Sequence, residues 1–145
     1  MLSVRIRRLR ASVRLPEYQT PGAAGFDLAA SEDAVIGPHA IALVPTGLVI
    51  AVPDGYFLGV FARSSTPLRR GLLVSNGVGV IDSDYCGATD EIKIQVLNVT
   101  GDPVTVRAGD RIAQGLFIPV ARASWDETND DLRAGSRGGF GATGG

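Results

Sequence analysis

The chain has 145 residues, of which 45% are hydrophobic and 20% charged, and its formal net charge is −1. This length and composition predict one globular domain with its own hydrophobic core. A net charge near zero argues against recruitment of nucleic acid through the overall field of the protein. No apolar run reaches the roughly 18 residues of a membrane-spanning helix, and no long apolar segment follows the basic N-terminus. We therefore expect no membrane partner, no secretory signal and a cytoplasmic location.

One cysteine and one histidine limit the available chemistry. Cys86 has no second cysteine for an internal disulfide, which fits a reducing compartment, and we interpret it as a small packed residue rather than a nucleophile. His39 is the lone histidine, so the sequence argues against histidine-based triads and zinc sites. The remaining candidates for catalytic or binding groups are carboxylates, hydroxyls and arginines.

Short β-branched runs separated by glycine and proline dominate the chain from its start. In "MLSVRIRRLR", Val4, Ile6 and Leu9 are expected on one side of a first strand whose arginines face water. Further strand-length runs lie within residues 34–62, 72–81, 91–99 and 103–120. No segment keeps an apolar period of 3.6 residues over three turns, so the pattern predicts an all-β sandwich or barrel.

One short helix is predicted in "SSTPLRRG", residues 64–71. Ser65 or Thr66 is a suitable N-cap and Pro67 suits the first helical position. Gly71 is expected to end the helix.

The start of this helix, "ARSST" at 62–66, carries a candidate anion site. Backbone N–H groups, serine hydroxyls and Arg63 together suit a phosphate group. An ordinary capped helix is the alternative interpretation.

The stretch "GVIDSDYCGATDEI", residues 79–92, is unusually polar for this chain. If the backbone is extended, Asp82 and Asp84 point to the same face. Two adjacent carboxylates are costly unless they are solvated, paired or catalytic, and one carboxylate can orient and deprotonate a water molecule. Tyr85 offers a flat ring that suits a sugar. A polar hairpin tip is the alternative.

Two further segments carry weaker signals. Asn76 and Gly77 form either a simple turn or a polar edge that matches a pyrimidine. The segment "AGDRIAQG", residues 108–115, places an acid, an arginine and Gln114 around two apolar residues. A turn that leads into a strand explains that segment equally well.

The last eleven residues, "GSRGGFGATGG", contain six glycines. This composition is too flexible to pack a core, and it lacks the lysine of a phosphate-binding P-loop. The tail is compatible with plain disorder or with a nucleic-acid-binding tail. It is also compatible with a lid in which Arg137 reaches phosphate and Phe140 stacks on a base.

Taken together and in order, these segments resemble the five motifs of the trimeric dUTP diphosphatase (dUTPase) family. The resemblance runs from about residue 15 to the C-terminus and rests mainly on the long third motif and on the glycine-rich tail. The five matching segments are "PEYQTPGAAGFDLAA", "ARSST", "NGVGVIDSDYCG", "GDRIAQG" and "RGGFGATGG".

The resemblance implies an all-β, jelly-roll or distorted β-barrel domain over residues 1–132, with one short helix, and a flexible tail over 133–145 that closes the active site. It also implies Mg²⁺-dependent hydrolysis of dUTP to dUMP and pyrophosphate. This activity limits uracil incorporation into DNA and supplies dUMP for dTMP synthesis. The implied assembly is a homotrimer with shared active sites, and no nucleic-acid partner is expected.

Under this resemblance, Asp82 matches the catalytic acid that positions the attacking water at the α-phosphate, with Asp84 as its neighbouring support. Tyr85 matches the tyrosine that packs under the deoxyribose, where a 2′-hydroxyl would clash. The hairpin that matches the uracil-reading segment comprises Asn76, Gly79, Val80 and Ile81.

The phosphate-binding second motif matches Arg63, Ser64 and Ser65, and Gln114 matches a contact to phosphate or to a metal-bound water. Asp27 matches the first-motif acid that supports the site and the metal region. No side chain is expected to bind Mg²⁺ directly, because the substrate phosphates and water hold the ion.

In the tail, Phe140 matches the aromatic residue that caps uracil. The residues that match the segment around the β- and γ-phosphates are Arg137, Gly141, Ala142 and Thr143.

Two departures from the family pattern stand out. Residues 88–90 form an apparent insertion between the third-motif glycine and Glu91. In the tail, Gly135 occupies the position where the family often has an arginine, and Arg133 and Arg137 flank it. Either arginine is therefore a candidate for the γ-phosphate.

Two alternatives remain at this stage. A dCTP deaminase has a related fold and needs a glutamate on the third-motif strand, for which Glu91 is the candidate. A non-catalytic β-trimer whose glycine–arginine tail, 133–145, binds single-stranded nucleic acid is the other, although aromatic residues are sparse and net charge is low.

Overall fold

The computed structural model describes residues 1–144 and contains, within them, eleven β-strands and one short helix. The elements in chain order are β1 (Arg5–Arg8), β2 (Phe26–Ala29), β3 (Ala34–Ile36), β4 (Ile41–Pro45), β5 (Leu48–Ala51), β6 (Tyr56–Ala62), α1 (Ser65–Arg70), β7 (Leu72–Val74), β8 (Gly79–Ile81), β9 (Lys93–Asn98), β10 (Val104–Val106) and β11 (Arg111–Pro119). The predicted all-β class with a single short helix is confirmed.

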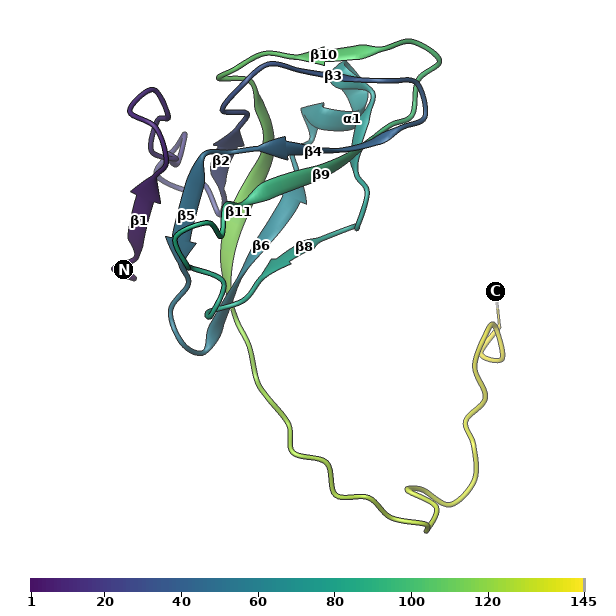
Figure 1. Cartoon of the computed structure of the whole chain (residues 1–145). Helices are drawn as coiled ribbons and strands as arrows, with labels where there is room; N and C mark the ends of the chain where they lie inside the picture. Colours follow the sequence, from purple (N-terminus) through teal and green to yellow (C-terminus); the bar gives the residue numbers. More distant parts are fainter. Residues whose placement is uncertain (145) are drawn as a thin grey trace.

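All strand pairs are antiparallel, and the sheets are open at their edges rather than closed into a barrel. The larger sheet has the order β2-β11-β6-β8, and a three-stranded sheet has the order β4-β9-β7. Two-stranded pairs β1-β5 and β3-β10 complete the body. Figure 1 shows β4 and β9 running across the strands of the larger sheet. The arrangement is consistent with a jelly-roll-like fold, and it places β2, β6, β8 and β11 side by side.

One hydrophobic core lies between these sheets and follows the two-residue period of the strands. In β9, Ile94 and Val96 are fully buried, while Lys93 is exposed. Leu28 and Leu58 of the larger sheet enter the same core. Each fully buried side chain of this size contributes about 1.5–3 kcal/mol, so the alternating pattern fixes which face of each strand turns inward.

The helix begins at Ser65, one or two residues earlier than the predicted caps imply. Its N-cap is Ser64, which has helical dihedrals and makes no side-chain capping hydrogen bond, so the expected cap at Ser65 or Thr66 is wrong. Pro67 accordingly lies at the third helical position. Gly71 does end the helix, in the left-handed conformation (φ 64°), as predicted. Tertiary contacts of Thr66, described below, decide where the helix starts.

The apparent insertion at 88–90 folds into a local turn. Asp90 closes it by accepting the Gly87 backbone N–H at 2.7 Å, and its own N–H donates to the Gly87 carbonyl. Beyond the turn, the Glu91 carboxylate accepts the Gly47 N–H at 2.7 Å. Residues 88–90 thus form a turn at the surface, and the chain re-enters the core at Ile92, which is fully buried.

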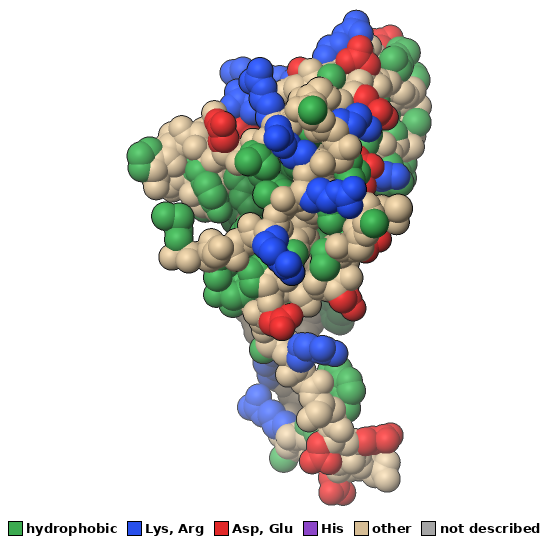
Figure 2. All heavy atoms as spheres, turned by 60° about the vertical axis from the view of Figure 1, so that its left-hand side comes forward, with side chains coloured by type: hydrophobic (Ala, Val, Ile, Leu, Met, Phe, Trp, Pro, Cys, Tyr) green, Lys and Arg blue, Asp and Glu red, His purple; other side chains and the backbone are tan. Residues whose placement is uncertain are grey.

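After β11 the chain leaves the body. Every residue from Val120 to Gly144 is exposed, and Figure 1 shows this segment curving away from the strands. The predicted boundary between residues 132 and 133 falls within it. Acidic side chains gather near the far end of the part of the tail seen in Figure 2, in agreement with the sequence "DETNDD" at 126–131.

Two smaller observations complete the fold. Cys86 is exposed rather than packed, so that expectation is wrong; its Sγ lies 3.7 Å from the Ser83 carbonyl oxygen. Within residues 1–144, no helix combines the length and the apolar character that crossing a membrane requires.

Candidate active site

A carboxylate held between two arginines lies where β2, β6 and β11 meet. Asp27 Oδ1 lies 2.8 Å from Arg63 Nε, and Asp27 Oδ2 accepts a hydrogen bond from Arg111 Nη1 at 3.0 Å. Arg63 Nη1 also donates to the Arg111 carbonyl at 3.2 Å. The Asp27 side chain is only 13% exposed. Charge-assisted pairs of this kind fix both planes of the guanidiniums, so Asp27 acts here as an orienting residue.

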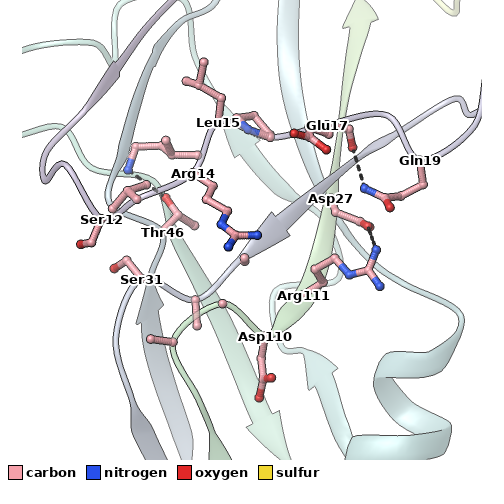
Figure 3. Close-up of a pocket in the computed structure, with 17 residues that line it drawn as sticks. Ser12, Arg14, Leu15, Glu17, Gln19, Asp27, Ser31, Thr46, Asp110 and Arg111 are labelled. Carbon is pink, nitrogen blue, oxygen red and sulfur yellow. Dashed lines mark hydrogen bonds and ion pairs between the residues drawn. The ribbon is translucent and has the colours of Figure 1, made fainter.

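Strand register explains why these groups meet. Gln114 lies opposite Asp27 on β2 and opposite Phe61 on β6. A register shift between Arg111 and Ala113 marks a bulge at the start of β11. Bulges redirect side chains, and here the guanidinium of Arg111 turns toward Asp27, as Figure 3 shows. Gln114 Nε2 donates to the Ala62 carbonyl at 3.0 Å, which joins the end of β6 to the same cluster.

Thr66 holds the first turn of α1 against this cluster. Its buried hydroxyl accepts the Arg63 backbone N–H at 3.1 Å and donates to the Ile112 carbonyl at 2.9 Å. This bridge places exposed Ser64 and half-buried Ser65 next to Arg63. The structure therefore brings together five predicted site residues: Asp27, Arg63, Ser64, Ser65 and Gln114.

The loop between β10 and β11 closes the other side of the cluster. Asp110 Oδ2 accepts the Arg107 backbone N–H at 2.9 Å and pairs with Arg70 Nη1 at 2.9 Å. Burial raises the pKa of Asp110, but these two interactions outweigh it, so its pKa lies below the ordinary value of 3.8. The pKa of Asp33 is lowered as well, first by the hydrogen bond from the Ala108 N–H and then by Arg107.

A hollow of about 730 Å³ lies beside Asp27, between the segment before β2 and this loop. Figure 3 shows Arg14 projecting into it and Asp110 and Arg111 along its edge. A second cavity, of about 490 Å³, lies on the side of α1 and shares Asp110 and Arg111 with the first.

The predicted base-reading hairpin forms a separate unit. Asn76 lies in an exposed turn, where Gly77 adopts φ 73°. Gly79 packs so closely on β6 that an added Cβ would lie 2.9 Å from Val60 Cβ. Val80 is 58% exposed and Ile81 is half-buried. Since β8 is the last strand in its sheet, one edge of its backbone has no strand partner within the described chain.

The polar segment after β8 is a turn. The strand ends at Ile81, and the Tyr85 N–H donates to the Asp82 carbonyl at 3.2 Å. The extended arrangement considered for Asp82 and Asp84 is therefore wrong, because the chain reverses between them; both are exposed. The Tyr85 hydroxyl donates to the Glu91 carbonyl at 3.1 Å, which fixes the ring while leaving it 40% exposed.

Asp82 and Arg63 lie at opposite ends of β6. The register puts Ile81 opposite Leu58, so Asp82 follows at the level of Phe57. Arg63 follows Ala62 at the other end of the strand. At about 3.3 Å per residue, the strand from Phe57 to Ala62 spans roughly 17 Å. One chain alone does not bring the predicted catalytic acid to the predicted phosphate ligands.

The predicted tail residues lie apart from both groups. Phe140 is fully exposed and has φ 49°, and Gly141 has φ 89°. The Ala142 N–H donates to the Gly139 carbonyl, so the end of the tail forms a local turn. Arg137 and Thr143 are also exposed.

Sequence reasoning singled out Gln114 but not Arg111, Asp110 or Arg70 as site residues, and the structure places all of these around the same cluster. The segment "GDRIAQG" contained a signal for Asp110 and Arg111. It could not be separated from a simple turn, because the bulge that redirects Arg111 depends on pairing with β2.

Comparison with known proteins identifies the family. The dUTPase family model matches residues 11–144. The chain belongs to the dUTPase family. A curated relative from Thermobifida fusca, deoxyuridine 5′-triphosphate nucleotidohydrolase, is 45% identical over 146 residues, covering 98% of this chain and 79% of that protein.

Solved dUTPase structures share the fold. The dUTPase from Streptococcus mutans is similar with a TM-score of 0.77 at 36% identity, covering 86% of this chain and 100% of that chain. A mutant dUTPase from phage phi11 of S. aureus, described with the coordination of a structural Mg(II) ion, has a TM-score of 0.79 at 21% identity, covering 89% of this chain and 98% of that chain. The predicted family is confirmed, while the roles of single residues stay predictions.

Proposed function

We propose that this chain is a dUTP diphosphatase that hydrolyses dUTP to dUMP and pyrophosphate. Membership of the dUTPase family and a relative named for this reaction support the activity. The observation that carries the proposal is the phosphate-binding arrangement: Arg63, fixed by Asp27 at 2.8 Å, stands beside the hydroxyls of Ser64 and Ser65. Oriented guanidinium and hydroxyl donors suit the several negative charges of a triphosphate.

Asp82 is proposed as the general base. Its carboxylate makes no hydrogen bond or ion pair with other residues of 1–144, so it is available to hold a water molecule. The water oxygen bonds to the α-phosphorus, its proton passes to Asp82, and the bond from the α-phosphorus to the bridging oxygen breaks. Pyrophosphate leaves, and dUMP remains.

The hairpin is proposed to select the base and the sugar. The open edge of β8 offers backbone N–H and C=O groups at Gly79, Val80 and Ile81, and Asn76 adds an amide at its start. A site built from such donors and acceptors disfavours the wrong base, because mismatched polar groups remain unpaired. The Tyr85 ring, fixed by its hydroxyl, supplies a wall against a 2′-hydroxyl.

A homotrimer with shared sites is proposed because one chain leaves the site incomplete. The candidate phosphate-binding residues and Asp82 lie at opposite ends of β6. A second copy therefore has to supply the hairpin. The outer face of the β4-β9-β7 sheet exposes Ile41, Leu43 and Leu73, which gives copies an apolar surface to bury. The exposed tail, with Arg137, is then free to reach a neighbouring site.

In that assembly, the tail is proposed to close over bound substrate. Phe140 caps the uracil, and Gly141, Ala142 and Thr143 follow the β- and γ-phosphates with Arg137. The exposed, turn-rich end of the tail supports a segment that becomes ordered when it meets a ligand. Closure would exclude water other than the nucleophile.

Mg²⁺ is proposed as the cofactor, held by substrate phosphates and water. Within residues 1–144 no group of three or more histidine, cysteine, aspartate or glutamate side chains is placed to hold a metal ion. Both carboxylate oxygens of Asp27 are paired with arginines, so Asp27 is proposed to orient these arginines rather than to bind the ion. Gln114 remains a candidate for a metal-bound water. The ion, when bound, neutralises charge on the phosphoryl oxygens.

The deaminase alternative loses support, because the Glu91 carboxylate accepts the Gly47 N–H at 2.7 Å and so has a structural role. In the cell, the proposed reaction would limit uracil incorporation into DNA and supply dUMP for dTMP synthesis.

The deciding experiment is a panel of dUTP, dTTP, dCTP and UTP, each with and without Mg²⁺, read as pyrophosphate and ammonia release. We expect pyrophosphate release that is selective for dUTP and dependent on Mg²⁺. Ammonia from dCTP, or equal turnover of all four nucleotides, would refute the proposal.

A further inference from the structure

The cavity on the side of α1 is lined mainly by arginines. Its volume is about 490 Å³. The residues that line it are Arg63, Ser65, Arg69, Arg70, Gly109, Asp110 and Arg111.

The charges around this cavity do not cancel. Arg63 and Arg111 share the single carboxylate of Asp27, and Arg70 pairs with Asp110. Arg69 makes no ion pair or side-chain hydrogen bond with any residue in the described range 1–144, and its side chain is exposed. Four guanidiniums therefore face two carboxylates, which leaves a positive surplus suited to an anion of more than one charge.

Arg69 is the guanidinium that is free to bind. The other three are each held by a carboxylate and can offer only their remaining N–H groups, whereas all the guanidinium N–H groups of Arg69 are without a partner in residues 1–144. It is also well placed, because Ser65 and Arg69 are four residues apart in α1 and so lie on the same helix face. A phosphate group at the Ser65 hydroxyl would lie within reach of the Arg69 side chain.

We propose that Arg69, which lies outside the five sequence motifs, is a further ligand for a diphosphate group bound in this cavity and a specificity residue for it. A planar guanidinium can bind two phosphate oxygens at once. The identification of the diphosphate with the β- and γ-phosphates of dUTP, or with the pyrophosphate product, rests on the proposed function. The expected binding of free pyrophosphate does not depend on the proposed function.

The test is isothermal titration of inorganic pyrophosphate, dUMP and the α,β-imido analogue of dUTP into the wild-type protein and into Arg69→Gln. Arg7→Gln is the matched control, because Arg7 is an exposed arginine of β1, which pairs only with β5. We expect Arg69→Gln to weaken pyrophosphate and imido-analogue binding by about tenfold to a hundredfold, the range of a lost charge-assisted hydrogen bond. Affinity for dUMP should stay within about twofold, since dUMP lacks the diphosphate, and Arg69→Lys should fall between the two.

Equal pyrophosphate affinity in wild type, Arg69→Gln and Arg7→Gln would overturn the inference, as would a wild-type protein that does not bind pyrophosphate. Circular dichroism of each variant checks that the fold is retained. Loss of the proposed function gives a different result: no dUTP hydrolysis by the wild type, with pyrophosphate binding still dependent on Arg69. Intact hydrolysis with binding independent of Arg69 would remove this inference alone.

Discussion

Among single residues, the proposed roles of Asp27 and Asp82 follow from whether each carboxylate is already paired. Asp27 has an arginine on each carboxylate oxygen and is mostly buried, so it is suited to orientation. Asp82 is exposed and its carboxylate has no partner within residues 1–144, so it is available for a water molecule. Their different surroundings support the different roles proposed for these two acids.

Asp82→Asn tests the role of the unpaired acid. The amide still accepts a hydrogen bond but does not take up the proton, so turnover of dUTP should fall by about 10²–10⁴ while the affinity for the imido analogue is kept. Steady-state kinetics and titration give the two quantities. Asp54→Asn, at an exposed turn, is the matched control and should leave both unchanged. Unaltered turnover in Asp82→Asn would remove Asp82 from the chemistry.

Among elements, α1 depends on its neighbours more than on its own capping sequence. A helix of six residues has little intrinsic stability. Thr66 fixes its first turn to the Ile112 carbonyl, and Arg70 fixes its last turn to Asp110. The candidate phosphate ligands at its start therefore keep their positions through contacts with β11 and with the loop that precedes it.

The contact at the end of α1 has a pH dependence that follows from its lowered pKa. Because folding lowers the pKa of Asp110 below 3.8, its stabilising effect is complete above that value. The effect is lost as pH falls through the folded-state pKa. Asp110→Asn should therefore cost about 1–3 kcal/mol in free energy of unfolding at pH 7, and the deficit should shrink on acidification below 3.8. Urea unfolding at several pH values measures it, and a deficit that does not change with pH would contradict this account.

For the whole molecule, the main feature is a site divided between distant parts of one chain. The proposed phosphate ligands cluster at one end of β6, the hairpin with Asp82 lies at the other end, and residues 120–144 are exposed beyond β11. Assembly of copies is the physical route by which such groups can meet, because each copy can present a different part to the same substrate.

Subunit complementation tests that division. Asp82→Asn and Arg63→Ala chains should each be nearly inactive alone. After co-refolding at equal amounts, activity should return to about a quarter of wild type, because two independent chains must each supply their intact residue. Activity is measured as pyrophosphate release. If both residues came from one chain, mixing would restore nothing.

Truncation after Ala134 tests the tail. Those of the removed residues that the structure describes, 135–144, are exposed and pack against no core, so the melting temperature and the number of chains in the assembly should not change. Turnover of dUTP should fall by about a hundredfold, because closure and phosphate contacts are lost. Calorimetry, light scattering and kinetics separate these effects. A truncated protein that unfolds, or one that stays fully active, would contradict the proposed lid.

The sequence alone was sufficient for the all-β class, the single helix with its end at Gly71, and the family, since these depend on local patterns. Strand alternation, glycine positions and ordered motifs are properties of neighbouring residues, and they survive without knowledge of the fold. The N-cap of α1 and the turn at Asp82 were not predictable in this way. The Thr66 hydroxyl donates to the Ile112 carbonyl, which is far away in the chain. The turn at Asp82 begins where the pairing of β8 with β6 ends.

What only the tertiary structure decided was which charged groups meet. Arg111 reaches Asp27 because β11 bulges where it pairs with β2, and Arg70 pairs with Asp110 whereas the neighbouring Arg69 has no partner within residues 1–144. The printed residues contain all of these side chains, but their pairing depends on strand register and on contacts between residues far apart in the chain. Electrostatic interactions act over a few ångströms in space, so sequence spacing alone does not determine them.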